Sequence, residues 1–390
     1  MNPKVAIIVL NWNGCKDTIE CLQALRCIDY DNHSLVLVDN ASTDESLAKI
    51  DTYFTDGLNL KSHVLERPVR NRPLRIIQYT AREANKSEGC RGAAACIGKN
   101  HAISLIANDS NDGFAEGNNL GVAYALSTLN PDYVLLLNND AVVDQHFLHE
   151  LTHTAERDER IGLLQPKMLR YADLTIDNAG GTCDPLAYCE PRGLHEKDEG
   201  QYDTGREEGF FYVSGACMLI RRSVLEAFSG ECFDPLLFAY YEDVDLSWMT
   251  RLIGFKVAYC PSSVCYHKGN AAFAGLSSFA EYLSHRNRIR VLIKNYSLST
   301  LVFVLPFTLV LKGVVLSLSA LFNLDIRELS NYLKALLWNV LNLRTTLTMR
   351  HRIQSQRKVG DKDVMHSMVP YSLGARLVIK QLLRERYLSP

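Results

Sequence analysis

The stretch YVLLLNND, residues 133–140, decides the fold of this chain. Its apolar and aromatic residues have the continuous hydrophobic pattern of a parallel strand that is buried on both faces. The run then ends in two amides and a carboxylate. Ligands of open α/β sheets bind just beyond the carboxyl ends of such strands, so Asp140 is a candidate oxygen ligand for Mg²⁺ or Mn²⁺ beside a phosphate. The alternative is an Asx-rich turn that only leaves the strand.

Two earlier apolar runs, residues 5–10 and 35–38, end in the same chemistry. Between them, residues 17–25 have the pattern of an amphipathic helix. This strand–helix–strand order predicts a βαβ unit and hence a parallel sheet. We expect the strand ends to line one crevice. The polar residues that follow the two runs include Asn11, Asn13, Asp39, Asn40 and Ser42.

Residues 103–107 predict a further strand, which leads into NDGFAEGNNLG, residues 111–121. Glycines there would let the backbone approach a ligand closely, and a helix is expected to begin within this stretch. The alternative is a Gly-rich turn before a helix. Residues 51–101 are rich in charged residues and proline, so we treat them as an insertion without a catalytic role.

The second half of the chain carries an acidic cluster in FDPLLFAYYEDVDLSW, residues 233–248. Glu242, Asp243 and Asp245 fall where a helix is expected to begin, and acids there complement the helix dipole. The apolar residues that precede the cluster favour a second interpretation, in which the helix begins partly buried at a cleft. Further on, His267 stands alone; such a histidine is more often structural than a ligand.

Bulk properties exclude some classes of protein. The chain has 390 residues and a formal net charge of -2, which gives no reason to expect nucleic-acid binding. Its eleven cysteines include no C-x-x-C pair, and its N-terminus enters a strand without the pattern of a signal peptide. We therefore expect a reduced, cytosolic protein without structural disulfides or a zinc site.

The C-terminal third changes character. Residues 299–323 are strongly apolar, with Lys312 and Pro306 inside, and are long enough to span or lie in a bilayer. The basic residues within 285–290 and 350–358 would suit an anionic cytoplasmic leaflet on either side of this segment. The alternative is a pair of helices packed on the rest of the protein or in a dimer interface. Membrane association is the interpretation we favour.

Together these segments resemble the family 2 inverting glycosyltransferases of the GT-A fold, and more narrowly the bacterial rhamnosyltransferase-like branch that builds surface polysaccharides. Each motif is weak alone, but their order and spacing are specific. The matching segments are VAIIVLNWNG (5–14), VLVDNASTDES (36–46), NDGFAEGNNLG (111–121), YVLLLNNDAVVD (133–144), VSGACMLIRRSVLEAFSG (213–230), FDPLLFAYYEDVDLSW (233–248), GFKVAYCPSSVCYHKGN (254–270), SHRNRIRVLIKNY (284–296) and KALLWNVLNLRTTLTMRHRIQSQRKV (334–359).

The resemblance implies an α/β fold of the GT-A, Rossmann-like type, with a mostly parallel sheet flanked by helices. It would occupy residues 1–285, interrupted by the insertion at about 51–101, and an apolar helical region would follow over 286–390. The residues that the resemblance assigns to nucleotide-sugar binding are Asn11, Asn13, Asp39, Asn40, Ser42, Asn111, Gly113, Phe114, Asn119, Asn138 and Asn139.

The resemblance also assigns the chemistry. Asn138-Asn139-Asp140 stands at the D-x-D motif of the family, so Asp140 is the sole carboxylate that this motif offers to a divalent cation, Mg²⁺ or Mn²⁺. His267 falls where GT-A enzymes often supply a further metal ligand. Asp243 matches the catalytic base, with Glu242 and Asp245 orienting it or binding the acceptor.

The implied activity is transfer of a sugar from a nucleotide diphosphate sugar, with dTDP-rhamnose as the donor suggested by the branch. The acceptor would be a saccharide or lipid-linked saccharide at the cytoplasmic face of the membrane. A nucleotidyltransferase is one alternative, but it would favour a Gly-rich triphosphate loop with Lys or Arg after the first strand, where this chain has NWNG (11–14). A non-catalytic membrane-bound assembly partner is another, against which the intact Asp140, Asp243 and His267 argue.

Overall fold

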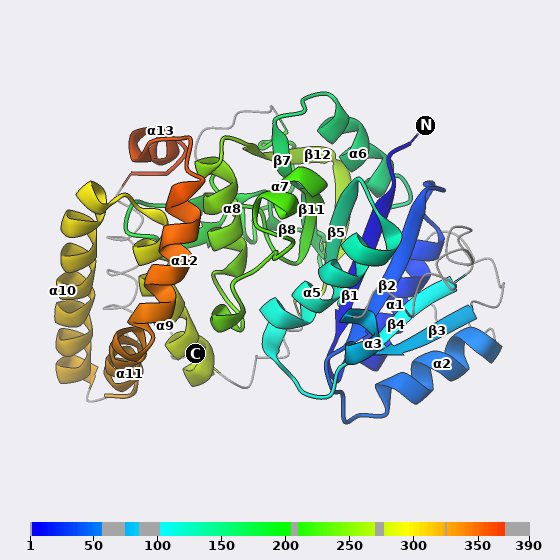
Figure 1. Ribbon diagram of the computed structural model, residues 1–390, viewed down its shortest axis with the longest axis horizontal. Coiled ribbons are helices and arrows are strands. Elements are labelled where there is room, and N and C mark those ends of the chain that lie inside the picture. The colour runs from blue at the N-terminus through cyan, green and yellow to red at the C-terminus, as the bar shows by residue number, and fades with distance from the viewer. Residues whose placement is uncertain are drawn as a thin grey trace.

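The computed structural model describes residues 2–56, 75–85, 102–203, 210–269, 277–323 and 326–370 (Figure 1). Its main element is a ten-stranded sheet with the order β3-β4-β2-β1-β5-β11-β7-β12-β6, to which β8 adds by pairing with β7. Helices lie on both sides of the sheet, and further helices gather at one end (Figure 1). The predicted α/β fold, with a large sheet flanked by helices and an apolar helix near the C-terminus, is confirmed.

The first half of the sheet is entirely parallel. Val5 to Val9 in its centre are fully buried, which explains the unbroken apolar pattern of that strand. The strands are β1 (Val5–Asn11), β2 (His33–Asp39), β3 (Arg75–Thr80), β4 (Ala102–Ala107) and β5 (Tyr133–Asn138). The connecting helices are α1 (Cys15–Arg26), α2 (Ser46–Asp56), α3 (Ala81–Asn85), α5 (Gly113–Tyr124) and the π-helical turn η1 (Ala125–Leu129).

The register of the parallel strands brings their carboxyl ends together. Asn11 of β1 pairs with Asp39 of β2, and Leu10 pairs with Asn138 of β5. The predicted polar strand ends therefore lie side by side along one edge of the sheet.

The second half of the sheet is mixed, because β11 pairs antiparallel with both β5 and β7 while β12 pairs parallel with β7. Its strands are β6 (Ala141–Val143), β7 (Ile161–Arg170), β8 (Ile176–Asn178), β11 (Cys217–Arg221) and β12 (Lys256–His267), and β9 (Gly181–Cys183) with β10 (Cys189–Pro191) forms a separate hairpin. The helices of this half are α6 (Phe147–Glu156), α7 (Arg222–Ala227), η2 (Pro235–Leu237) and α8 (Glu242–Leu252).

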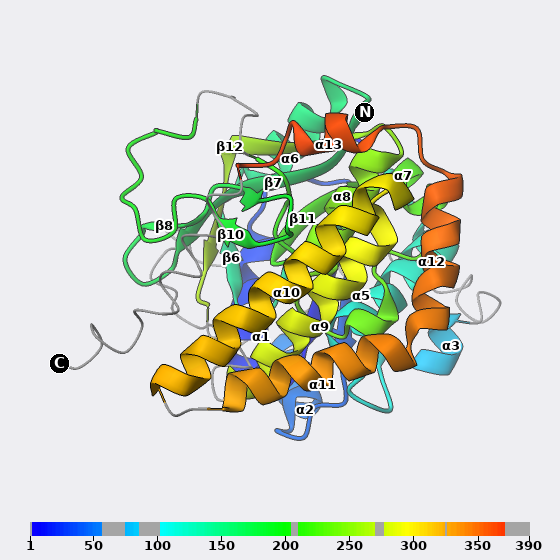
Figure 2. The same cartoon turned by 90° about the vertical axis from the view of Figure 1, so that its left-hand side faces the viewer.

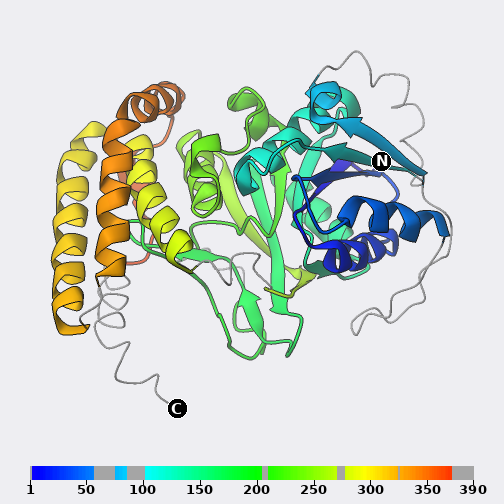
Figure 3. The ribbon, with the colours of Figure 1, turned by 90° about the horizontal axis from the view of Figure 1, so that it is seen from below.

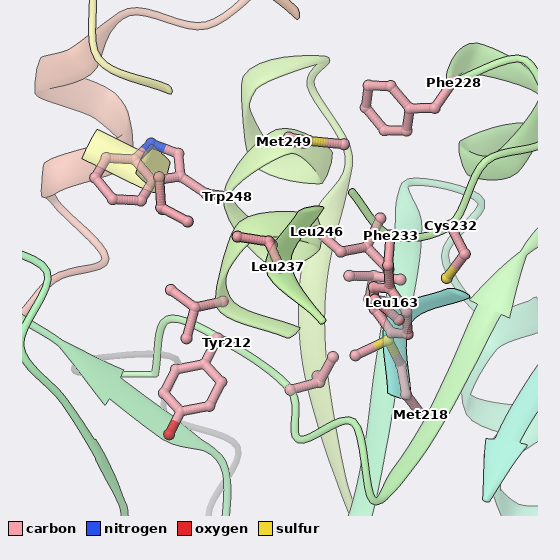
Figure 4. Packing of buried hydrophobic residues seen from close by; sticks show 14 of the residues in the cluster. Leu163, Tyr212, Met218, Phe228, Cys232, Phe233, Leu237, Leu246, Trp248 and Met249 are labelled. Atoms are coloured by element: carbon pink, nitrogen blue, oxygen red, sulfur yellow. The ribbon is translucent and has the colours of Figure 1, made fainter. Parts of the chain in front are cut away.

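Apolar side chains fill both sides of the sheet. One cluster includes the buried face of α8, and Figure 4 shows Leu246 of this helix close to Phe233 and Leu163. Trp248 is fully buried and packs edge-on against Phe211 and Tyr296. This packing fixes α8, the helix that begins with the acidic cluster.

The segment expected to be an insertion, residues 51–101, is described only in part. Strand β3 and helix α3 lie within it, and β3 forms the edge of the sheet by pairing with β4. Residues 57–74 and 86–101 lie outside the described residues.

The C-terminal helices lie side by side at one end of the molecule, as the yellow and orange ribbons in Figure 3 show. They are α9 (Ser277–Asn295), α10 (Leu298–Asn323), α11 (Arg327–Leu341), α12 (Leu343–Ser355) and α13 (Asp361–Met365). The expected boundary between residues 285 and 286 falls inside α9. Helix α10 is the one described helix that is long and apolar enough to cross a membrane.

The interpretation of residues 285–290 as a basic flank for a membrane surface is wrong. Arg286, Arg288 and Arg290 are 7%, 3% and 0% exposed. They lie inside the protein because α9 packs against α8, α11 and α12, and Arg290 pairs with the buried carboxylate of Asp234. The same basic run that would suit a lipid surface here neutralises charge in the core.

Candidate active site

A network of polar side chains joins the ends of β1 and β2. Asn11 is fully buried, and its Nδ2 donates to Asp39 Oδ1 at 2.7 Å and to Ser42 Oγ at 3.0 Å. Ser42 in turn donates through its backbone N–H to Asp39 Oδ2 at 3.0 Å. Asn11 and Asp39 therefore bind each other and hold the ends of β1 and β2 together.

A second network ties these strand ends to α5. Asn40 Nδ2 donates to Asn111 Oδ1 at 2.9 Å and to the carbonyl of Gly113 at 3.1 Å. Gly113 has φ +86°, and a Cβ atom there would lie 2.5 Å from the ring of Phe238. Only glycine satisfies both conditions, so the glycine of the predicted Gly-rich stretch sets how closely the α5 start approaches the acidic-cluster loop.

Asp140 forms an ion pair with His267 at the other side of the strand ends. Asp140 Oδ1 lies 3.3 Å from His267 Nε2, and Asp177 of β8 lies 3.0 Å from His267 Nδ1. Burial would lower the pKa of His267, but its bonds to the two carboxylates outweigh burial and raise the pKa to about 10. For Asp140, burial opposes ionisation, yet the hydrogen bond and charge of His267 hold the pKa of this carboxyl below its usual value.

The spacing of Asp140 and His267 suits a divalent cation, which would take the place of the proton on His267 Nε2. Adjacent ligands at about 2.1 Å from one ion lie about 3 Å apart, close to the 3.3 Å separation here. Among the described residues, no group of three or more His, Cys, Asp or Glu side chains is placed to hold an ion. The pair therefore suits a cation that takes its other ligands from a diphosphate and water, which is how Mg²⁺ commonly binds. Asp177 would fix the orientation of the His267 ring.

Asp243 lies at the first turn of α8 and is held by backbone amides. Gly215 N–H donates to its Oδ2 at 3.1 Å, and Val244 N–H donates to its Oδ1 at 2.7 Å. Burial outweighs these bonds and raises the pKa of Asp243 to about 6. A carboxylate whose pKa lies just below neutrality is suited to accept a proton at physiological pH.

Its neighbours Glu242 and Asp245 differ in environment. Burial, reinforced by the charge of Asp243, raises the pKa of Glu242 well above its usual value. Asp245 accepts hydrogen bonds from Lys294 Nζ at 2.5 Å and Asn295 Nδ2 at 2.8 Å. The carboxylate of Asp245 therefore binds α9 and acts on Asp243 only through the placement of α8.

The loop before Asp243 is strained and is held by α9. Phe238, Tyr240 and Tyr241 have φ of 63°, 68° and 70°, a region that costs non-glycine residues of order 1–3 kcal/mol each. Asn287 of α9 is fully buried, and its Nδ2 donates to the carbonyls of Leu237, Ala239 and Tyr240 at 2.8, 2.9 and 2.7 Å. Such a set of bonds to one amide stabilises the loop conformation from which the acidic helix begins.

The segment before β11 joins the two halves of the site. Ala216 accepts a hydrogen bond from the backbone N–H of Asn138 at 2.8 Å, while the adjacent Gly215 donates to Asp243. Gly215 and Ala216 are adjacent in the chain. The segment that binds Asp243 therefore also contacts the end of β5, two residues before Asp140. A Cβ atom added at Gly215 would lie 3.2 Å from the ring of Phe114, so Phe114 lies at the same junction.

Other predicted residues are placed differently. Asn119 binds the backbone of Phe233 through both its Nδ2 and Oδ1, so it ties α5 to the acidic-cluster loop. Asn13 accepts from Thr43 N–H, and Asn139 donates to Thr18 at 2.9 Å beneath the cleft. Asn138 is half-buried at the end of β5.

Sequence reasoning missed two residues of the site. Asp177 belongs to a segment that has the composition of a turn, and Asn287 lies within a basic run, so nothing local marks either of them. A signal for Asn287 does exist, since an amide between arginines is unusual for a helix face that contacts lipid.

Comparison with known proteins decides the family. Residues 64–289, more than half of the chain, match the glycosyltransferase-like family 2. The chain belongs to this family. The family prediction made from the sequence is therefore confirmed. The matched residues include the Asp140 segment and the acidic cluster, and they begin after β1 and β2.

The chain is also similar to individual proteins. Over 194 residues the chain is 26% identical to the low-salt glycan biosynthesis hexosyltransferase Agl10 of Haloferax volcanii; the match covers 48% of this chain and 59% of that protein. Among solved structures, one similar to this chain is the mannosyltransferase PcManGT from Pyrobaculum calidifontis in complex with GDP-Man and Mn²⁺. It has 14% sequence identity and a TM-score of 0.46, and the match covers 91% of this chain and 86% of the PcManGT chain. Residues 1–349 of TarS from S. aureus also have 14% identity and a TM-score of 0.46, with coverages of 93% and 89%.

Proposed function

We propose that this protein is an inverting glycosyltransferase that moves a sugar from a nucleotide diphosphate sugar to a saccharide or lipid-linked saccharide in surface polysaccharide synthesis. The observation that carries the proposal is that one segment, the residues before β11, contacts both Asp243 of α8 and the end of β5, which precedes Asp140. Asp243, whose pKa is raised to about 6, contacts Gly215, and Asp140 follows the strand that contacts Ala216. The membership in glycosyltransferase-like family 2 supports the reaction class.

The residues of this chain have separate tasks in that reaction. Asp243 takes the proton of the acceptor hydroxyl as that oxygen bonds to the anomeric carbon and the bond to the diphosphate breaks on the opposite face. One such displacement inverts the configuration of the sugar. Glu242 is buried beside the base, and burial together with the charge of Asp243 raises the pKa of its carboxyl well above the usual value. We infer that Glu242 orients Asp243 or contributes to acceptor binding.

Asp140 and His267 would hold a divalent cation, Mg²⁺ or Mn²⁺, with Asp177 orienting the imidazole. When bound, the cation neutralises charge that builds on the leaving diphosphate. Asn138 and Asn139 would lie beside the donor, while Asn11, Asn13, Asp39, Asn40, Ser42, Asn111, Gly113, Phe114 and Asn119 would shape or support the nucleotide cleft. Because Asn138 replaces one acid of the D-x-D motif, we expect the cation to bind mainly together with the donor.

The donor and the place of action follow from the resemblance and from α10. We infer that dTDP-rhamnose is the first donor to test, and the hexosyltransferase Agl10 among the similar proteins supports a hexose-type donor. The acceptor would be presented at the cytoplasmic face of the membrane, where an apolar helix of 26 residues would keep the enzyme close to lipid-linked saccharides. The protein would then be peripheral or integral at that face.

The direct test is transfer by the purified chain with a panel of nucleotide sugars and Mn²⁺, together with donor binding by calorimetry. We expect Asp140→Ala to abolish the metal-dependent part of donor binding, because the motif then offers no carboxylate. Asp144→Ala is the matched control, since Asp144 is an exposed carboxylate four residues on, and it should bind as the parent does. The assignment is rejected if donor binding is the same with and without the metal and is unchanged in Asp140→Ala. It is also rejected if the protein releases pyrophosphate from a nucleoside triphosphate instead of transferring a sugar.

The pH dependence of turnover provides a second prediction. Because Asp243 must be ionised to act as the base and burial raises its pKa to about 6, kcat should be constant above this pH and fall below it. The decline approaches tenfold per pH unit well below the pKa. Steady-state rates between pH 5 and 8 at saturating donor measure it. A profile that stays flat down to pH 5 would contradict the role of Asp243.

A further inference from the structure

One face of the C-terminal helices is apolar and exposed. All but four of the exposed large apolar side chains of the described residues lie between Leu298 and Leu347. Figure 2 shows α10 and α11, which carry most of them, next to each other on the side toward the viewer. The side chains are Leu298, Val302, Phe303, Phe307, Val310, Val314, Leu318, Leu321 and Phe322 in α10 and Ile326, Leu333, Leu337, Val340, Leu341, Leu343 and Leu347 in and beside α11 and α12. We call these residues the apolar face.

The opposite side of α10 belongs to the protein. Lys312 in the middle of the helix is 5% exposed and lies 3.4 Å from Glu328 of α11, and Val304, Thr308, Val315 and Leu316 are also buried. One third of the most apolar window of α10 is buried in this way. The exposed apolar side chains of α10 therefore lie on the side that faces away from the protein.

The apolar face carries positive charge and no exposed acid. Lys334 and Arg344 are exposed among its leucines and valines. Among the described residues from 298 to 351, no acidic side chain is exposed. Glu328 is partly buried and lies close to Lys312 and His285. An apolar surface bordered by cations is complementary to an anionic lipid interface.

We propose that α10 and α11 lie in the plane of an anionic membrane surface, with the apolar face inserted among the lipids and Lys312 turned into the protein. The protein would then be attached to one leaflet without spanning it. This proposal deepens the proposed function. It depends on that function only to explain why the protein would need a membrane. The docking can be measured without any sugar transfer.

The first test is sedimentation of the full chain with vesicles of phosphatidylcholine alone or mixed with phosphatidylglycerol. We expect binding that is stronger to the anionic vesicles, and we expect Phe303→Ser with Phe307→Ser to weaken it about tenfold or more. Leu174→Ser with Leu194→Ser is the matched control, since these leucines are 52% and 42% exposed but lie off the apolar face. Lys334→Glu with Arg344→Glu should remove the preference for anionic lipid.

The second test separates a helix in the plane from one that spans. Phe303→Trp and Phe322→Trp each add a fluorophore near one end of α10. Quenching by lipids brominated at different depths, taken as the difference from the parent with its three tryptophans, locates each added one. A helix in the plane gives similar shallow depths for both, whereas a spanning helix separates them by about 28 Å along the normal. Phe303, Phe307 and Phe322 are all exposed, and a denaturation curve checks that each variant folds as the parent does.

Several results would overturn the proposal. They are a failure of the parent to bind either vesicle, unchanged binding after the Phe303 and Phe307 changes, or two different depths for the tryptophans. A parent that is dimeric by light scattering, binds no lipid, and becomes monomeric in the serine variant would assign the apolar face to a second copy of this chain. If vesicle binding holds while no sugar transfer is found, the proposed function fails and the docking stands.

Discussion

Replacing Asp243 by asparagine is expected to lower kcat by about 10²–10⁴-fold, the usual contribution of a general base. Asparagine matches the shape of aspartate and can still accept the N–H of Val244, which donates to Asp243 Oδ1 at 2.7 Å. It cannot take a proton from the acceptor hydroxyl. Donor binding should survive, because the proposed donor contacts come from the strand ends on the other side of Gly215 and Ala216.

Steady-state kinetics and donor calorimetry on the same preparation measure this effect. Asp245→Asn provides the contrast, since Asp245 lies on the same helix with its carboxylate bound to Lys294 and Asn295. That variant should be less stable but keep the pH profile set by Asp243. If Asp243→Asn turns over like the parent, or loses donor affinity as well as rate, the carboxylate is not the base.

The strands of the site were predictable because their signal is local. Residues 5–10, 35–38 and 133–137 are buried on both faces, so each is apolar along its whole length, and each is followed by polar residues where the sheet ends. The register that places Asn11 beside Asp39 follows from parallel pairing of such strands. The start of α8 was also predictable, because three acidic residues follow a run of apolar residues.

The partners of the polar side chains could not be predicted in the same way. His267 meets Asp177, which lies 90 residues away in the chain, and nothing local tells which carboxylate the fold delivers to an imidazole. The basic run at 285–290 has the same composition whether it faces lipid or a buried acid. Asp234, the acid that Arg290 meets, stood outside the cluster that the sequence singled out.

Asp234 should carry the largest single contribution to stability in the helical end of the protein. Its carboxylate lies 2.7 Å from both Arg290 Nε and Lys294 Nζ, and the three side chains are 2%, 1% and 0% exposed. Asp234→Asn keeps the shape but leaves two buried cations with less negative charge beside them. Breaking a buried ion pair by removing one partner costs about 3–5 kcal/mol, so we expect a loss of that size in the free energy of unfolding.

Urea denaturation of the parent and of Asp234→Asn measures the loss. Glu45→Gln is the control, because the Glu45–Lys49 pair is exposed and such pairs contribute about 0–1 kcal/mol. Burial alone would raise the pKa of Asp234, but the charge of Lys294 and the bond from Arg290 outweigh it and hold the pKa below its usual value. The stabilisation is therefore complete above the unfolded pKa of about 3.9 and is lost as pH falls toward the folded value. In Asp234→Asn, the free energy of unfolding should therefore fall less steeply with decreasing pH than in the parent. If it falls equally in both proteins, other carboxylates cause the acid dependence.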